Sequence, residues 1–196
     1  RVEAVLKKDG VGLADCAVAE SKFEKGENIT GRMLTILPRI SEIHQRGTPD
    51  MEFAVNGLLA RSLLAAGQSG DAYRTVESLR TKFAEEGQER FLPNMDAMLV
   101  RIALHTGDLD HADTWYREKA PRNPMRINIM KRYQYLTQAM VELADGKPGA
   151  AMLTLSPLEA YIQNCGRHID GIHLNILTAV SLYSCLLYTS PSPRDA

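Results

Sequence analysis

The chain has 196 residues, of which 44% are hydrophobic and 24% are charged, and its formal net charge is −1. This near-neutral balance gives no general reason to expect binding to nucleic acid or to an anionic membrane. The three cysteines, Cys16, Cys165 and Cys185, form no CxxC pair, which is typical of free thiols in a reducing compartment. The cysteine pattern therefore favours a cytoplasmic protein, and since no apolar run is long enough to span a bilayer, we expect no membrane contact.

Helical patterns follow one another from the N-terminus, without an alternating strand pattern of useful length. We expect a first pair of helices over residues 13–25 and 29–45, and Pro38 is expected to kink the second of them. The chain begins at Arg1 without a methionine or a signal-peptide pattern, and we therefore expect a fragment of a longer protein.

The second pair of helices has the clearest start signal. Thr48-Pro49-Asp50 offers a hydroxyl cap, a proline at the first helical position and an acid in the first turn. This helix is expected to run to about Ala66. Its partner is expected to begin after a Ser69 cap and to run to about Glu86.

The rest of the chain predicts two more pairs of helices and a final single helix. These helices are expected over residues 93–106, 109–119, 127–145, 148–164 and 170–184. Pro121 and Pro124 mark the loop between the third and fourth pairs, and Pro157 is expected to kink the helix that contains it.

Glycines recur about every 40 residues at the expected turns, at Gly26, Gly67, Gly107 and Gly146. The residue seven positions before each glycine is small or slim: Ala19, Ala60, Val100 and Ala139. The residue three positions before is large and apolar: Phe23, Leu64, Leu104 and Leu143. The residue five positions after is tiny: Gly31, Ala72, Ala112 and Ala151.

This repeat has a physical cause. A glycine ends a helix readily, because a left-handed residue costs least without a Cβ atom. Positions seven and three before it share one helix face, and a tiny residue in the next first turn lets the two helices cross closely. A repeat of this length indicates stacked helical hairpins that cannot bury their apolar faces alone. The sequence therefore predicts an all-α fold, a right-handed superhelical solenoid of antiparallel helix pairs.

The spacing of the glycines and alanines resembles the tetratricopeptide repeat, stretched from its usual length of about 34 residues. A closer similarity is to the helical-repeat sensor region of bacterial LuxR-family transcription regulators of the maltose-activator (MalT) type. Leu58–Gly67, Gly107–Trp115 and Tyr135–Gly146 carry this resemblance, which continues through residues 151–183. It covers nearly all of residues 13–184.

In that family an ATPase module precedes the repeats and a LuxR-type helix-turn-helix follows them. The chain contains no GxxxxGK[ST] phosphate loop and no dinucleotide fingerprint, so no ATP-binding or DNA-contacting residue is carried over. The resemblance implies a non-catalytic segment that senses a small-molecule inducer or a protein partner, while ATP and DNA bind other modules. The alternatives are a generic tetratricopeptide-like scaffold for protein–protein interaction and a helical appendage of an enzyme.

One register position predicts a binding groove. Six residues before each turn glycine lie Glu20, Arg61, Arg101 and Met140. In tetratricopeptide-like stacks the corresponding position faces the concave groove. Two arginines in register there would grip a carboxylate, a phosphate or a peptide acid, and His105 lies on the same flank. The alternative is that Glu20, Arg61 and Arg101 are solvated or pair with local acids.

Other candidate groups point to ordinary structural roles. His168 and His173 are five residues apart and do not share a helix face, and Asp170 suits a helix N-cap, so we expect no metal site. Trp115 and Tyr116 are expected to pack between repeats, although an aromatic platform for a sugar is the alternative. We expect no catalytic residue, because the chain contains neither HExxH nor GxSxG.

Two segments depart from the general pattern. Six basic residues lie between Arg117 and Arg132, and we expect a solvated loop there. The last twelve residues, 185–196, match the translation of a commonly used sequencing-library adapter. We expect this tail to be adapter-derived and disordered, and the repeat domain to cover residues 1–184. The alternative is a natural, disordered tail rich in serine and proline.

Overall fold

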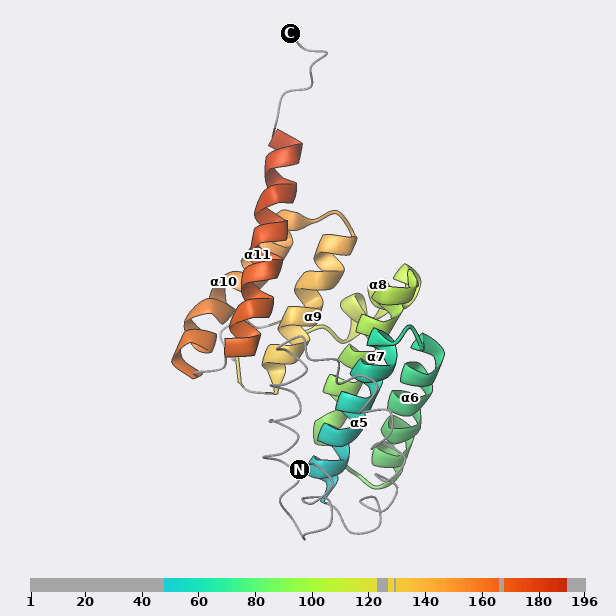
Figure 1. Cartoon of the computed structure of the whole chain (residues 1–196). Coiled ribbons are helices and arrows are strands. Elements are labelled where there is room, and N and C mark those ends of the chain that lie inside the picture. Colours follow the sequence, from blue (N-terminus) through green and yellow to red (C-terminus); the bar gives the residue numbers. More distant parts are fainter. Residues whose placement is uncertain (1–47, 123–126, 129, 166–167, 190–196) are drawn as a thin grey trace. The chain divides into compact units, whose positions relative to one another are not determined.

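The computed structural model describes residues 48–122, 127–128, 130–165 and 168–189 (Figure 1). Within these residues the chain forms seven α-helices and one short 3-10 helix, with no strand, which confirms the predicted all-α class. The elements are α5 (Pro49–Ala65), α6 (Ser69–Glu85), η2 (Glu89–Phe91), α7 (Leu92–Thr106), α8 (Leu109–Glu118), α9 (Lys131–Ala144), α10 (Pro148–Cys165) and α11 (His168–Thr189).

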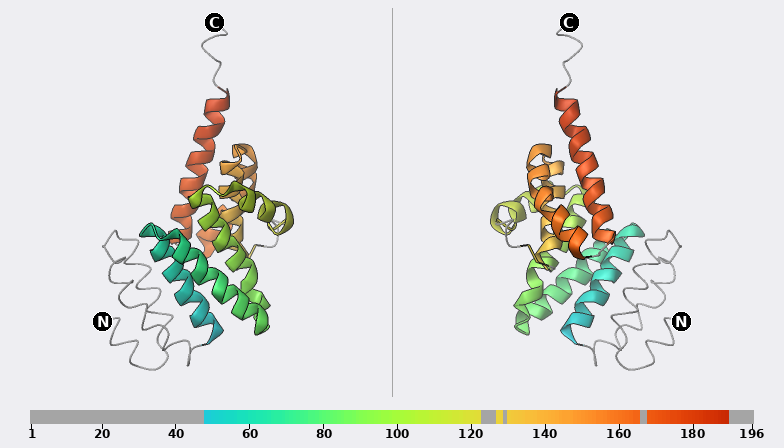
Figure 2. Two further views of the ribbon diagram at one scale, coloured as in Figure 1. Left: turned by 90° about the vertical axis from the view of Figure 1, so that its right-hand side faces the viewer. Right: turned by 90° about the vertical axis from the view of Figure 1, so that its left-hand side faces the viewer.

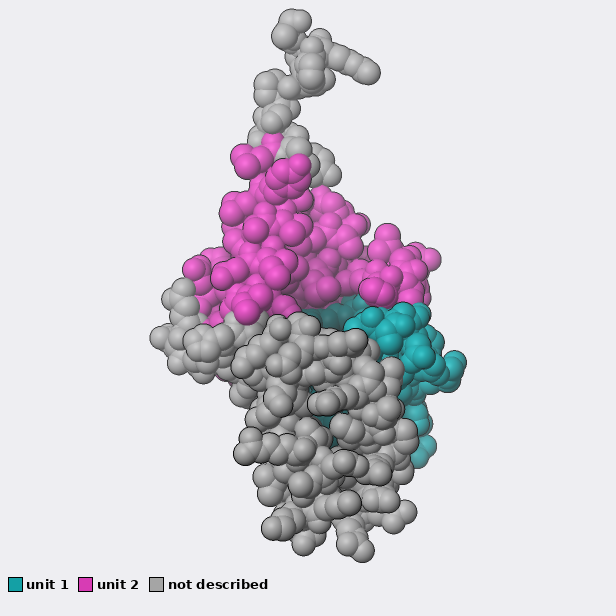
Figure 3. Space-filling model, in the orientation of Figure 1, with its two compact units in different colours: residues 1–102 teal, residues 103–196 magenta. Residues whose placement is uncertain are grey.

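The chain divides into two compact units, Arg1–Ile102 and Ala103–Ala196, and the boundary falls inside α7 (Figure 3). The helices predicted over 13–25 and 29–45, the kink at Pro38 and the turn at Gly26 lie outside the described residues. None of the helices described here has both the length and the apolar character needed to cross a lipid bilayer.

Four helices end in the same hydrogen-bonded turn. Gly67, Gly87, Gly107 and Gly146 all have positive φ, between 69° and 81°. In α5 the amide of Gly67 donates to the carbonyl of Leu64 at 3.0 Å, and the amide of Gln68 donates to that of Leu63 at 2.8 Å. This pair of bonds is the Schellman arrangement, which satisfies two carbonyl groups at the helix end. The same two bonds close α6, α7 and α9, so three of these turns confirm the predicted glycines.

Gly87 was not predicted as a turn glycine, because it falls outside the 40-residue repeat. It ends α6, and the chain then enters η2 rather than a second helix of a pair.

The residues predicted to allow close crossing are buried. Ala72, Ala112 and Ala151, each five residues after a turn glycine, are at most 1% exposed. Ala60 and Ala139, seven residues before one, are at most 4% exposed. Helix α5 packs against α6, and α9 packs against α10. Because each pair is joined by a short turn, its helices run antiparallel, with small side chains where the backbones approach.

Three aromatic rings meet within the mostly aliphatic core of the first unit. The ring of Phe91 in η2 stacks on that of Phe53 from α5, with 4.9 Å between centroids. It also contacts the ring of Phe83 from α6 at 5.2 Å. Phe83 and Phe91 are almost completely buried, so the short 3-10 helix carries the residue on which two longer helices converge.

Three helices build the core of the second unit. One buried cluster takes its side chains from α9, α10 and α11: Tyr135, Leu136, Ala139, Ala151, Leu155, Leu158, Ile162 and Leu174. Helix α10 lies between the other two in sequence and packs against both. The C-terminal half of α11 extends past α9 and α10 (Figures 1 and 2). The side chains of Tyr183 and Leu186 in that half are both 65% exposed.

Capping residues account for two differences from the predicted helix starts. Thr48 caps α5 as predicted, and its hydroxyl accepts from the Met51 amide at 3.4 Å. Ser69 is the first residue of α6 rather than its cap, because Gln68 already occupies the cap position after the glycine turn. Helix α9 begins at Lys131, four residues later than predicted. There the side-chain oxygen of Asn128 accepts from the amides of Met130 and Lys131, at 3.1 and 2.8 Å.

The last helix does not end at Ser184. Helix α11 continues to Thr189, so residues 185–189 are helical and the expected disorder is wrong for them. The physical reason is local, because Cys-Leu-Leu-Tyr-Thr contains no helix breaker before Pro191. Residues 190–196 lie outside the described residues, and the adapter origin of the tail stays a prediction. Pro157 lies inside α10, and the helix continues on both sides of it.

We predict opposite effects of alanine at two glycines that have equal space around them. A Cβ atom would meet no other atom within 4 Å at either Gly107 or Gly149. Gly107 has φ +81°, so Gly107→Ala should lower the free energy of unfolding by about 1 kcal/mol. Gly149 lies in the first turn of α10, where Gly149→Ala should raise it by about 0.5–1 kcal/mol. Urea unfolding of both variants measures the two changes in the free energy of unfolding. Changes of the same sign would contradict the requirement for glycine in the left-handed turn.

We also predict that a buried and an exposed ion pair differ in their contribution to stability. Arg132 Nε lies 2.9 Å from Asp170 Oδ2, with both side chains about nine-tenths buried. Asp170→Asn removes one negative charge from a buried ion pair and should cost about 3 kcal/mol. The control is Asp71→Asn, which breaks the exposed Arg74–Asp71 pair and should cost less than about 1 kcal/mol. If both variants lose similar free energy of unfolding in urea, the buried ion pair between α9 and α11 contributes no more to stability than the exposed pair.

Candidate functional site

The residues of the predicted groove are only partly described. Arg61 on α5 and Arg101 on α7 belong to the first unit, where both are half-buried and engaged by neighbouring groups. His105 is exposed near the C-terminal end of α7, in the second unit. Glu20 lies outside the described residues. The groove formed by these four side chains therefore stays a prediction.

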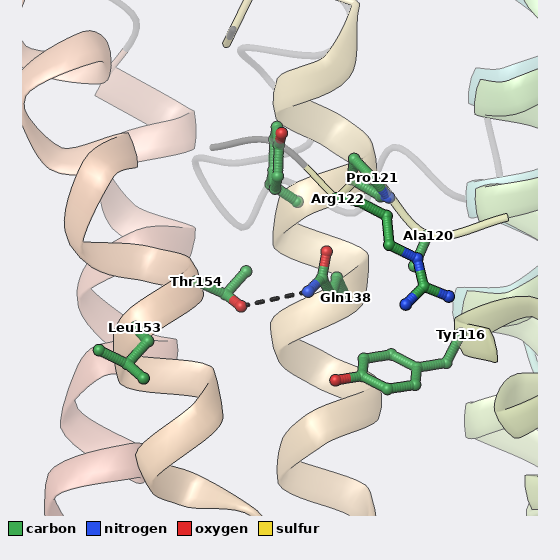
Figure 4. Close-up of a pocket in the computed structure, with 8 residues that line it drawn as sticks. Tyr116, Ala120, Pro121, Arg122, Gln138, Leu153 and Thr154 are labelled. Carbon is green, nitrogen blue, oxygen red and sulfur yellow. Dashed lines mark hydrogen bonds between the residues drawn. The ribbon is translucent and has the colours of Figure 1, made fainter. Parts of the chain in front are cut away.

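Two hollows lie in the second unit, and Tyr116 lines both of them. The first, which we name the Gln138 hollow, has a volume of about 270 Å³. Its lining comes from α8, the loop after it, α9 and α10: Tyr116, Ala120, Pro121, Arg122, Tyr135, Gln138, Leu153 and Thr154. In Figure 4 the ring of Tyr116 extends from α8 toward α9. The side chain of Arg122 lies on the same side of Gln138 as the ring of Tyr116.

The second hollow, which we name the Glu142 hollow, has a volume of about 240 Å³. Its apolar lining includes Leu104, Leu109, Ala112, Val141 and Ala144. Its charged lining is made of four carboxyl groups and one amine: Asp110, Asp113, Glu142, Asp145 and Lys147. Both hollows are smaller than the sites that enclose drug-sized ligands, so each suits a small molecule or a single side chain.

A chain of hydrogen bonds joins three helices between these hollows. The Tyr116 hydroxyl on α8 donates to Glu142 Oε1 on α9 at 3.0 Å. Gln138 Nε2, one turn earlier on α9, donates to the same oxygen at 2.9 Å. The same nitrogen lies 3.3 Å from Thr154 Oγ1 on α10 (Figure 4). Because Glu142 Oε1 receives two donors, the amide of Gln138 must present its nitrogen to the carboxylate.

This polar group is buried, and two of its oxygens lack donors. Glu142 is 3% exposed. Within the described part of the chain, neither Glu142 Oε2 nor Gln138 Oε1 has a hydrogen-bond partner. A buried acceptor without a donor costs about 1–3 kcal/mol, and more when it is charged. Gln138 and Glu142 each line one of the two hollows, so a donor group that enters a hollow lies next to a residue with an unsatisfied acceptor.

Burial raises the pKa of Tyr116 above its ordinary value of 10.0. The negative charge of Glu142 and the hydrogen bond to it raise the pKa of Tyr116 further, because both disfavour a second negative charge. The positive charges of Lys147 and Arg122 act in the opposite direction. Tyr116 therefore remains a neutral donor to Glu142 over the physiological range of pH.

The amine of Lys147 is held by a neighbouring acid. Its Nζ pairs with Asp145 Oδ2, and this hydrogen bond together with the charge of Asp145 raises the pKa of Lys147. Asp113 is also paired, because Arg117 Nη2 lies 2.9 Å from its Oδ2. The ion pairs thus engage two of the four carboxylates of the Glu142 hollow.

The structure corrects two assignments of charged residues. Asp170 lies in the first turn of α11 rather than at its N-cap, because the helix already begins at His168, and its carboxylate pairs with Arg132. Arg132 is therefore buried, although we predicted that the basic stretch ending there is a solvated loop. No group of three or more metal-ligating side chains is arranged to hold a metal ion in the described residues.

Sequence reasoning missed Glu142, Gln138 and Thr154 as site residues. One signal was present, because Gln138 and Glu142 are four residues apart and flank Ala139, a predicted core position. This spacing predicts that the two side chains are neighbours on one helix face, and the structure shows that this face is buried. Trp115 is 4% exposed, as expected for packing, whereas Tyr116 is half-buried and lines both hollows.

Comparison of the chain with protein-family models, with curated proteins and with solved structures gave no significant match. The geometry described above is therefore the basis for the function that we propose.

We predict that Tyr116→Phe lowers stability at neutral pH and weakens its dependence on alkaline pH. Loss of the hydroxyl removes one donor from buried Glu142, which should cost about 1–2 kcal/mol. The pKa of Tyr116 is higher in the folded chain, so the unfolded chain loses its proton first above about pH 10. The associated stability is present below that pH and is lost as the pH rises through the folded pKa.

Urea unfolding between neutral pH and about pH 11 measures this effect, and Tyr116→Phe should lose less stability over that range than the unchanged chain. Tyr73→Phe, at a 40% exposed position on α6, is the matched control and should behave like the unchanged chain. If Tyr116→Phe loses as much free energy of unfolding at alkaline pH as the unchanged chain, the raised pKa of Tyr116 does not contribute to stability, which would contradict this prediction.

Proposed function

We propose that the chain is an inducer- or partner-sensing segment of a LuxR-family transcription regulator of the maltose-activator type. The proposal includes the finer architecture, a right-handed superhelical solenoid of tetratricopeptide-like helix pairs, and a cytoplasmic location. Two features support it. The Schellman turns at Gly67, Gly107 and Gly146 are each followed five residues later by a buried alanine. The resemblance in Tyr135–Gly146 covers the helix that carries the buried polar group.

The observation that carries the proposal is the hydrogen-bonded chain through Glu142. Tyr116, Glu142 with Gln138, and Thr154 come from three consecutive helices, α8, α9 and α10. A group bound in either hollow would compete for these bonds and so change how the helices pack. In a solenoid, small changes between neighbouring helices add up along the stack. This is a physical route from ligand binding to a distant module.

A protein-interaction scaffold is the second candidate, and an exposed apolar stripe on α11 favours it. Ile172, Ile176, Val180 and Tyr183 are spaced by four, four and three residues and are each between 46% and 65% exposed. This spacing places them along one side of the helix, as in amphipathic helices that dock on a partner. A scaffold would use this stripe without any need for the two hollows.

The source DNA separates the two candidates. We expect the full reading frame around these residues to encode a phosphate-loop ATPase upstream and a basic helix-turn-helix downstream. Re-sequencing across the codon of Ser184 and upstream of Arg1 tests this directly. A frame that holds only further helical repeats would reject the regulator and favour the scaffold. A catalytic module other than this ATPase on either side would reject both in favour of an enzyme appendage.

A further inference from the structure

The charges of the Glu142 hollow point to the kind of group that it would bind. Four carboxylates and one amine line it. Arg117 lies outside the lining and pairs with Asp113, while Lys147 pairs with Asp145. The remaining carboxyl groups belong to Asp110, which is exposed, and Glu142, which is buried. The hollow is therefore negative in balance, and it attracts a cationic group.

The free oxygen of Glu142 narrows the choice of cation. Oε1 already accepts hydrogen bonds from Tyr116 and Gln138, whereas Oε2 has no partner in the described part of the chain. A guanidinium group binds best when both carboxylate oxygens accept in parallel. A primary ammonium is a point charge and needs only one acceptor. One free oxygen therefore suits an ammonium group better than a guanidinium group.

The apolar wall accounts for the rest of such a ligand. Leu104, Leu109 and Val141 line the same hollow, and they offer a surface for the methylene stem that carries an amine. The volume of about 240 Å³ leaves room for a short alkyl chain.

We propose that the Glu142 hollow binds a primary ammonium group on a short alkyl stem, with Glu142 Oε2 as its acceptor. This inference rests on the proposed sensing function and names the chemistry of the sensed group. The ammonium comes either from a small amine or from a lysine side chain of a protein partner. Both sources present the same atoms to the hollow.

Access to the acceptor requires a side chain to move, because Glu142 Oε2 is covered in this structure. Tyr116 is half-buried, lines both hollows and bonds to the same carboxylate. An ammonium group that reaches Oε2 therefore binds the carboxylate that Tyr116 already holds. Binding is thus coupled to the bond that joins α8 to α9, and this coupling is what a sensor needs.

Titration of the full 196-residue chain with pentylammonium chloride tests the proposal. Trp115, the single tryptophan, is buried and adjacent to Tyr116, so its fluorescence reports on movement there. We expect saturable binding of pentylammonium and no comparable change with 1-pentanol, its uncharged analogue. Glu142→Gln keeps the shape of the side chain and should weaken binding about tenfold or more. Glu118→Gln, an exposed position on α8 outside the hollow, is the matched control and should leave affinity unchanged.

A second variant keeps the test decisive if Glu142→Gln fails to fold by circular dichroism. Lys147→Met removes the competing amine at an exposed position and should tighten pentylammonium binding several-fold. Equal saturable responses to pentylammonium and pentanol would overturn the proposal. So would unchanged affinity in both variants, or an equal loss in Glu118→Gln, which would indicate a general charge effect.

The two sources of the ammonium are separated by a second titration. The peptide acetyl-Gly-Lys-Gly-amide presents a lysine, and the same peptide with norleucine is its control. Binding of the lysine peptide alone supports recognition of a partner's lysine, and binding of pentylammonium alone supports a small amine. If neither binds, the ammonium site is rejected. The reading frame tests the regulator independently, so the two failures are distinguishable.

Discussion

The close crossing of neighbouring helices is the constraint on which the described structure depends. A left-handed glycine closes each first helix through two backbone hydrogen bonds, and a nearly buried alanine follows five residues later. The glycine sets where the chain reverses, and the alanine sets how near the next backbone can come. Larger side chains, such as Leu136 and Leu155, then fill the space on either side of the contact.

The same close packing gives the polar group at Glu142 its importance. A carboxylate inside a helical core is costly unless donors surround it, and Glu142 receives donors on one oxygen only. The hydrogen bonds around Glu142 connect α8, α9 and α10, so a change in any of them affects how these three helices pack. An apolar residue at position 142 would remove this charge but would leave the donors of Tyr116 and Gln138 without their acceptor.

Most of the helical fold could be predicted, because glycines, prolines and apolar spacing act over a few residues. Thr48, Gly67, Gly107 and Gly146 lie where their local chemistry places them. The misses at Ser69 and Asp170 share one cause. Each is a good capping residue by type, but α6 begins at Ser69 itself and α11 begins at His168, two residues before Asp170. The capping preference of a residue type shows which residues are suitable N-caps, but it does not determine the residue at which the helix begins.

The sequence by itself determined the all-α class, the turn glycines and the small residues at the helix crossings, since these follow from backbone conformation and side-chain size within a short window. Only the tertiary structure decided that Glu142, Gln138, Tyr116 and Thr154 meet, and that Arg132 is buried against Asp170. Apart from the Gln138–Glu142 bond within α9, these contacts join residues on different helices, up to 38 positions apart along the chain. The geometry of the contacts between helices depends on how the helices pack, which no local pattern in the sequence encodes.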